Sequence, residues 1–180
     1  MRLLLDACVI FPTVLREILL GCAAGGLFTP LWSARILEEW ARASRRLGPL
    51  AEGQARAEAA AMMAAFPQAM VPPQPGLESR LHLPDEADIH VLAVAIGGSA
   101  DAILTFNAAD FPRGVLAAEG VQRRDPDGFL WELWSFHPEA VGAVIAGVHA
   151  RAEAISGAPV SLRALLKRSQ LPRLAKALQA

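Results

Sequence analysis

Short, fully apolar runs alternate with helical patterns in this chain, and this alternation restricts the possible folds more than any other feature. Residues 2–5 form an apolar run that ends at Asp6. A second run, residues 102–106, follows a helical pattern that begins after Asp85 and runs to Ile96, where Gly97-Gly98 ends it. Strands that are apolar on both faces are typical of parallel sheets covered by helices. The sequence therefore predicts an α/β protein with a central parallel sheet.

Helix signals fill most of the remaining chain. Ser33 is placed to cap a helix over residues 34–47, with a buried stripe of Ile36, Leu37, Trp40 and Ala41. Asp85 is placed to cap a helix that runs to Ile96, with Asp88 completing a carboxylate variant of the capping box. Further helices are expected at residues 12–26, 50–65, 128–136, 139–156 and 161–178.

Charge and cysteine content exclude several classes of protein. The net charge is −1, but residues 1–150 hold 11 Lys and Arg against 17 Asp and Glu, while residues 151–180 hold 6 against 1. Cys8 and Cys22 are too few for a disulfide framework, so we expect a reduced, cytoplasmic protein. The apolar N-terminus resembles a signal peptide only as far as Asp6, which interrupts it. Charged residues also interrupt every other apolar stretch before it reaches the roughly 20 residues that a membrane span requires. No transmembrane helix and no membrane partner are predicted.

Acidic residues gather where the predicted strands end. Asp6 follows the first apolar run, and Asn107 and Asp110 follow the second. Asp88 aligns with the packed side of its helix, and Glu39 lies slightly nearer the buried stripe of its own helix than Glu38 does. Because parallel sheets gather functional groups at the carboxyl ends of their strands, we expect these acids to converge. Asp85 is interpreted as a cap and left out of the group.

Converging carboxylates repel one another unless a hard divalent cation holds them, which favours a Mg²⁺ or Mn²⁺ site. Zinc is disfavoured because neither cysteine has a second Cys or a His at ligand spacing. Such a site suits phosphodiester hydrolysis by an activated water.

Four motifs in order resemble the PIN domain, especially the VapC-type toxin ribonucleases. They are Leu-Leu-Asp-Ala-Cys-Val at 4–9, Ser-Ala-Arg-Ile-Leu-Glu-Glu at 33–39, Asp-Glu-Ala-Asp-Ile-His-Val-Leu-Ala at 85–93 and Thr-Phe-Asn-Ala-Ala-Asp-Phe-Pro at 105–112. The resemblance implies a Rossmann-like three-layer α/β PIN domain over residues 1–135, a helical C-terminal extension over 136–180, and a Mg²⁺- or Mn²⁺-dependent ribonuclease.

By position, Asp6, Glu39 and Asp88 match the first three acids of the family, and Thr105 matches the small hydroxyl residue that orders the site. Asn107 stands where many members have a fourth acid, with Asp110 three residues later. We therefore predict Asp6, Glu39, Asp88 and Asp110 as catalytic residues, and Asp6, Asp88 and Asn107 as metal ligands. The choice of Glu39 over Glu38 follows motif spacing, and Asn107 leaves a second metal in question.

The resemblance also implies partners: an RNA substrate, a cognate antitoxin protein and a second copy of the chain in a homodimer. The basic C-terminal segment is similar to helical extensions of some of these toxins. Its residues Arg163, Lys167 and Arg168 are candidate RNA contacts, with docking on the acidic body as the equal alternative.

Other classes remain as alternatives. A haloacid-dehalogenase-type phosphatase requires a second aspartate where this chain has Cys8, and a phosphoacceptor receiver domain requires a lysine before Lys167. The stronger alternative is a degenerate PIN domain that binds RNA or a protein partner without cleavage, because Asn107 weakens the acidic site.

Overall fold

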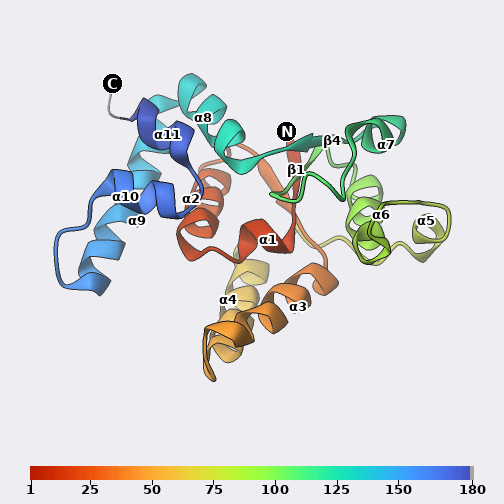
Figure 1. The fold of residues 1–180 in the computed structure, drawn as a ribbon, viewed down its shortest axis with the longest axis horizontal. Coiled ribbons are helices and arrows are strands. Elements are labelled where there is room, and N and C mark those ends of the chain that lie inside the picture. Colours follow the sequence, from red (N-terminus) through yellow and green to blue (C-terminus); the bar gives the residue numbers. More distant parts are fainter. Residues whose placement is uncertain (179–180) are drawn as a thin grey trace. The chain divides into compact units, whose positions relative to one another are not determined.

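The central sheet has four strands, and all of them run parallel. In this computed structural model, which describes residues 1–178, the strand order is β2-β1-β3-β4 (Figure 1). The strands are β1 Arg2–Leu5, β2 Thr29–Leu31, β3 Ala102–Leu104 and β4 Gln122–Arg124. Register pairs Leu4 with Leu31 on one side and with Ile103 on the other. The predicted class is confirmed: the protein is three-layer α/β, with a parallel sheet flanked by helices and a C-terminal helical part.

The chain divides into two compact units. The first comprises Met1–Phe11 and Phe28–Arg124 and contains the sheet; the second comprises Pro12–Leu27 and the chain from Asp125 onward. The helices of the first unit are α1 Ala7–Ile10, α3 Ala34–Ala43, α4 Ala51–Ala65, α5 Pro75–Glu78, α6 Ile89–Gly97 and α7 Arg113–Ala118, with 3₁₀ turns η1 Ser44–Leu47 and η2 Glu86–Asp88. The helices of the second unit are α2 Thr13–Ala24, α8 Pro126–Phe136, α9 Pro138–Ser156, α10 Leu162–Arg168 and α11 Pro172–Ala177.

The helix caps of the first unit follow the predicted signals, with one exception. Ser33 Oγ accepts a hydrogen bond from the Ile36 amide at 3.2 Å, and the predicted stripe of α3 is buried. Asp85 Oδ1 accepts from the Ala87 amide at 2.9 Å. The capping box is wrong, because Asp88 makes no side-chain cap bond and its carboxylate accepts from Asn107 instead.

The single helix expected over residues 161–178 is also wrong, because the chain breaks between α10 and α11. Gln170 adopts a left-handed conformation with φ of 60°, and Pro172, which lacks an amide hydrogen, opens α11. Asp127 of α8 accepts hydrogen bonds from the amides of Arg173 and Leu174, at 2.8 and 2.9 Å. α11 is therefore tied by its first turn to α8 within the second unit.

The apolar runs that predicted the sheet are buried as expected. Leu3 and Leu4 are fully buried, and so are Ile103 and Leu104 on the neighbouring strand. Both cysteines are free thiols. Among residues 1–178, no helix combines the length and the apolar character that crossing a bilayer requires.

Candidate functional site

The carboxyl ends of β1 and β3 form the switch point of the sheet. From β1 the chain moves outward to β2, and from β3 it moves outward in the opposite direction to β4, so the two central strands diverge in their connections. Ligands of parallel α/β proteins bind in the crevice at such a point. Asp6 comes directly after β1 and Thr105 directly after β3, which places both residues at this position.

Asp6 is a buried carboxylate that is held by hydrogen bonds. Its side chain is 7% exposed, and its Oδ2 accepts from Thr105 Oγ1 at 2.7 Å and from Cys8 Sγ at 3.1 Å. Thr105 Oγ1 also accepts from the Asn107 amide at 2.9 Å. The threonine hydroxyl therefore fixes the carboxylate after β1 to the loop after β3.

That loop also carries Asn107 and Asp110. Asn107 Nδ2 donates to Asp88 Oδ2 at 3.1 Å and to Asp110 Oδ2 at 2.6 Å. The amide thus bridges two carboxylates that would otherwise repel each other. Asn107 turns its NH₂ group, and not its carbonyl oxygen, toward them in this structure.

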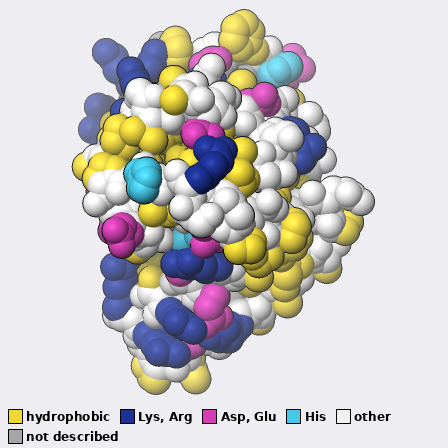
Figure 2. Space-filling model, turned by 90° about the vertical axis from the view of Figure 1, so that its right-hand side faces the viewer, with side chains coloured by type: hydrophobic (Ala, Val, Ile, Leu, Met, Phe, Trp, Pro, Cys, Tyr) yellow, Lys and Arg dark blue, Asp and Glu magenta, His cyan; other side chains and the backbone are white. Residues whose placement is uncertain are grey.

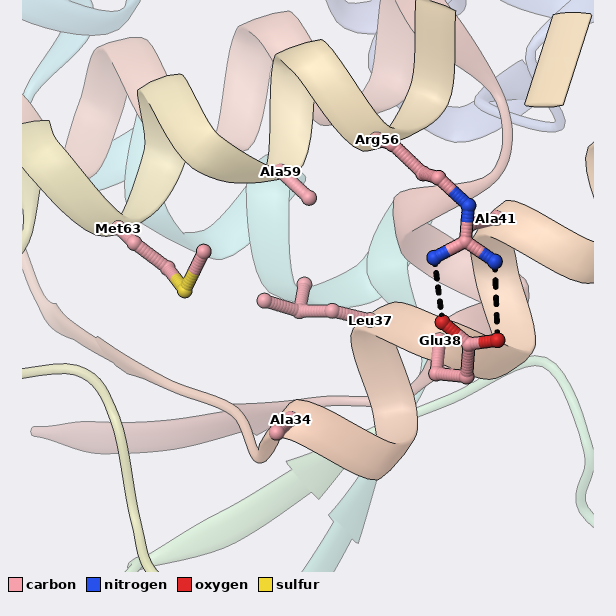
Figure 3. Close-up of a pocket in the computed structure, with 7 residues that line it drawn as sticks. All are labelled: Ala34, Leu37, Glu38, Ala41, Arg56, Ala59 and Met63. Atoms are coloured by element: carbon pink, nitrogen blue, oxygen red, sulfur yellow. Dashed lines mark hydrogen bonds and ion pairs between the residues drawn. The ribbon is translucent and has the colours of Figure 1, made fainter. Parts of the chain in front are cut away.

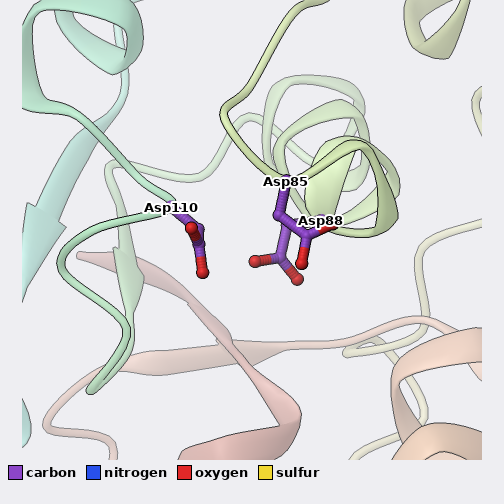
Figure 4. Close-up of side chains that lie close together, drawn as sticks. All are labelled: Asp85, Asp88 and Asp110. Atoms are coloured by element: carbon purple, nitrogen blue, oxygen red, sulfur yellow. The ribbon is translucent and has the colours of Figure 1, made fainter.

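Three aspartates form an acidic cluster: Asp85, Asp88 and Asp110. One carboxylate oxygen of each lies within 4.8 Å of the others. Figure 4 shows Asp85 and Asp88 projecting from the start of one helical segment toward Asp110 on the opposite loop. Burial, together with the negative charges of Asp6, Asp85 and Asp110, raises the pKa of Asp88 to about 6. The cluster is therefore costly to ionise without a cation.

The structure adds Asp85 and Cys8 to the site residues predicted from sequence. Asp85 was assigned to capping alone, and it does cap η2, but this uses only one of its two oxygens. Cys8 gave no signal of its own beyond its place two residues after Asp6. Burial first, and then the charge of Asp6, raises the pKa of its thiol to about 12. Cys8 is therefore a neutral hydrogen-bond donor to Asp6.

Glu39 lies on the side of α3 that faces the segment bearing Asp88. Its Oε1 is 3.0 Å from Nε2 of the buried His90, an ion-pair distance, although neither ring nitrogen makes a well-directed hydrogen bond with the described residues. Arg35 contacts Glu39 at 3.1 Å and also reaches the Ala87 carbonyl at 3.5 Å. Burial raises the pKa of Glu39, but His90 and Arg35 outweigh it and hold the pKa below its ordinary value. Glu39 is not a member of the acidic cluster.

Glu38 points to a different neighbour. It forms two hydrogen bonds with Arg56 of α4, at 2.6 and 2.9 Å, and one with Arg42 at 2.7 Å. These arginines lower its pKa to about 2. Figure 3 shows the Glu38–Arg56 pair at one end of a groove of about 180 Å³ between α3 and α4, with apolar side chains such as Leu37 and Met63 at the other. Basic and acidic side chains are intermixed over these two helices at the lower end of the face in Figure 2.

The predicted RNA contacts of the C-terminal segment belong to the second unit. Arg163, Lys167 and Arg168 are exposed on α10, whose Leu165 and Leu166 are buried. No ion pair joins these three side chains to a carboxylate of residues 1–178.

The donors around the cluster fit a hard divalent cation. They are carboxylate oxygens, which Mg²⁺ and Mn²⁺ prefer. Burial raises the pKa of Asp88 most, and the neighbouring negative charges, whose repulsion a cation would relieve, raise it further.

The fold and these acids define a class. It is the class of parallel α/β proteins that carry carboxylates at the switch point of the sheet. The family model described as "PIN domain" matches residues 2–109, more than half of the chain, and the chain belongs to the PIN domain family. The match includes Asp6, Asp88, Thr105 and Asn107 and ends one residue before Asp110. Comparison with curated proteins and with solved structures gives no match.

Proposed function

We propose that this PIN-domain nuclease is a metal-dependent ribonuclease that hydrolyses RNA phosphodiester bonds with an activated water. The observation that carries the proposal is the acidic cluster at the switch point, where burial and then repulsion raise the pKa of Asp88 to about 6. Enzymes concentrate such perturbed carboxylates where their chemistry takes place.

The proposed roles follow from the contacts. Asp6, Asp88 and Asp110 hold Mg²⁺ or Mn²⁺. Asn107 keeps Asp88 and Asp110 together through its NH₂ group, and turning the amide over would make its carbonyl oxygen a further ligand. Thr105 orients Asp6. When bound, the cation lowers the pKa of a water and offsets charge that develops on the phosphate oxygens.

Glu39 has a separate proposed role at the edge of the site. Its pairing with Arg35 and His90 keeps it ionised and fixes its position. From there it accepts a proton from the attacking water or orients that water through the intervening solvent. No protein nucleophile is required.

Cleavage of a mixed RNA pool by the purified full chain, with Mg²⁺ or Mn²⁺ and with EDTA, tests the proposal. We expect cleavage only with the metal, and its loss in Asp6→Asn, Asp88→Asn and Glu39→Gln proteins. Glu139→Gln, on α9 of the second unit, removes a charge of the same sign and is the control. Undiminished cleavage in all three site variants would refute the assignment.

The alternative is a PIN domain that binds RNA or a protein without cutting. The bridging Asn107 favours it, because an amide contributes no charge toward a cation. Metal-independent RNA binding without new 5′ ends, in a folded wild-type protein, would select this alternative.

We also propose that the protein is a VapC-type toxin that acts in the cytoplasm, forms a homodimer and is inhibited by a cognate antitoxin. The resemblance of the four motifs supports this. The proposal includes a PIN domain over 1–135 and a helical extension over 136–180, in which Arg163, Lys167 and Arg168 contact RNA. Induced expression in a bacterial host, beside Asp88→Asn, tests it: growth arrest with discrete new RNA 5′ ends in the wild type alone supports a toxin. Normal growth with abundant folded wild-type protein counts against it.

A further inference from the structure

A basic pocket lies beside the edge strand β4. Its lining residues are Arg113 and Ala117 of α7 and Val121, Gln122, Arg123 and Arg124 along β4, and its volume is about 350 Å³. Figure 1 shows α7 next to β4. The lining residues include three arginines, one glutamine and no acidic residue. We call this set of six residues the β4 pocket.

The β4 pocket retains positive charge. Arg113 is exposed and has no ion-pair partner among residues 1–178. Glu119, the acid at the end of α7, is engaged by Arg80 through hydrogen bonds of 2.7 and 2.8 Å. By contrast, Arg42 and Arg56 of the same unit are both paired with Glu38. A free guanidinium offers the planar fork that binds phosphate oxygens in pairs.

The β4 pocket is connected to the acidic cluster through one loop. Arg123 Nη1 donates to the carbonyl of Ala108 at 2.5 Å and to that of Phe111 at 3.0 Å. These two residues flank Asp110. At the end of β4, the Arg124 carbonyl accepts from the Thr105 amide at 3.1 Å. The pocket and the cluster thus share the loop between β3 and α7.

We propose that the β4 pocket binds a backbone phosphate of single-stranded RNA and directs the strand toward the acidic cluster. The inference rests on the proposed ribonuclease function. Carboxylates repel the phosphates of a substrate, so a site made of them requires basic groups nearby to hold the strand. Contacts to phosphate position a nucleic acid without reading its sequence. The pocket accordingly sets where the RNA lies and not which bases are cut.

Binding of a fluorescein-labelled oligouridylate to the full chain in EDTA tests the proposal without depending on cleavage. We expect Arg113→Gln to weaken binding about five- to tenfold, because it removes one charged hydrogen-bonding group. The slope of log affinity against log salt should fall by about 0.7, the value for one phosphate contact on a single strand. Arg113→Lys, which keeps the charge, should retain most of the affinity.

Arg42→Gln is the matched control, because it removes the same charge from an exposed arginine on α3, outside the β4 pocket. Equal RNA affinity and equal salt slope in the Arg113→Gln, Arg42→Gln and wild-type proteins would overturn the proposal. The charges on β4 would then act only to block strand pairing at the sheet edge. Arg113-dependent binding of inorganic phosphate or of an oligoglutamate peptide, with RNA affinity unaffected, would likewise overturn it.

The result of this binding experiment can be told apart from the result of the cleavage experiment that tests the proposed function. A wild-type protein that cuts no RNA with Mg²⁺ but loses RNA affinity on Arg113→Gln refutes the nuclease proposal and supports the phosphate pocket. A protein that cuts RNA, and whose RNA affinity does not change on Arg113→Gln, supports the nuclease proposal and refutes the phosphate pocket. Unchanged thermal unfolding of each variant, followed by circular dichroism, shows that the fold is intact.

Discussion

Single side chains at the switch point show how the protein holds negative charges close together. Thr105 and Cys8 donate to Asp6, and Asn107 donates to both Asp88 and Asp110. Each donor is uncharged, so it offsets repulsion without cancelling the negative charge. The site therefore keeps its negative charge, and burial together with this charge raises the pKa of Asp88.

That raised pKa makes the stability of the metal-free protein depend on pH. Because the pKa of Asp88 is raised from 3.8 to about 6, the folded state binds the proton more tightly than the unfolded state. The stability supplied by this proton is full below about pH 4 and is lost as the pH rises through 6. Asp88→Asn removes the charge, so at pH 7 without metal the variant should have the higher free energy of unfolding. The difference should be no more than ~1 kcal/mol, because the carboxylate is partly exposed and solvent screens its interactions.

Urea unfolding of both proteins in EDTA at pH 4 and pH 7 measures this difference. The amide oxygen that Asp88→Asn introduces can still accept the hydrogen bond from Asn107, so a difference in packing is not expected. A stability difference that does not change between the two pH values would contradict the prediction. With Mg²⁺ at pH 7 the wild type should instead be more stable than Asp88→Asn, since the cation stabilises the folded form that binds it.

Thr105 permits a second prediction, about the hydroxyl that joins Asp6 to the loop after β3. Thr105→Val keeps the shape but removes the donor to Asp6 and the acceptor for the Asn107 amide. We expect a loss of about 1–2 kcal/mol in the free energy of unfolding and a marked fall in RNA cleavage. Thr105→Ser keeps the hydroxyl and is the control. Cleavage by the valine variant at the wild-type rate would show that the hydroxyl does not order the site.

Sequence reasoning found several of the residues that meet at the switch point, because each follows a strand or faces a packed helix side. It left out Asp85 because capping already explained that residue, and one explanation concealed a second use of the same carboxylate. The bridge by Asn107 could not be predicted, since it depends on where two loops distant in sequence come together.

Among the elements, α3 has two acidic residues in succession that serve different neighbours. Glu38 bonds to Arg56 of α4, and Glu39 lies against His90 of α6. The two residues thus connect α3 with α4 and with α6. Of the two glutamates, Glu39 is the one that lies near the segment carrying Asp88.

Comparing Glu38→Gln with Glu39→Gln therefore separates a structural role from a role in the site. We expect Glu39→Gln to reduce RNA cleavage about 100-fold or more, as loss of a positioned proton acceptor does. Glu38→Gln should leave cleavage close to the wild-type rate. Cleavage rates under saturating Mg²⁺ provide the measurement. A larger loss in Glu38→Gln would reverse the assignment made from motif spacing.

Elements with strong local signals were predicted well, and elements defined by distant partners were not. The apolar strands β1 and β3 and the capped helix α3 follow directly from the sequence pattern. The edge strands β2 and β4 were not predicted, because each has three residues and β4 is entirely polar, so that only pairing with β1 or β3 defines them. The break before α11 had a readable signal in Pro172.

At the scale of the whole molecule, charge is divided along the chain. Residues 1–150 carry a net −6 and residues 151–180 a net +5. Within the second unit, α10 buries Leu165 and Leu166 and leaves Arg163, Lys167 and Arg168 exposed. The apolar side of this helix is thus already used in packing, whereas its basic side is exposed.

Replacing Arg163, Lys167 and Arg168 together with glutamine tests in the full chain whether these residues bind RNA. If each residue neutralises one phosphate of single-stranded RNA, the slope of log affinity against log salt falls by about 2. The midpoint of thermal unfolding should stay unchanged, because the three side chains pair with no carboxylate of residues 1–178. Fluorescence anisotropy over a salt series, with circular dichroism as the control for folding, measures both quantities. A lower midpoint with an unchanged salt slope would show that these charges hold the protein together and do not bind RNA.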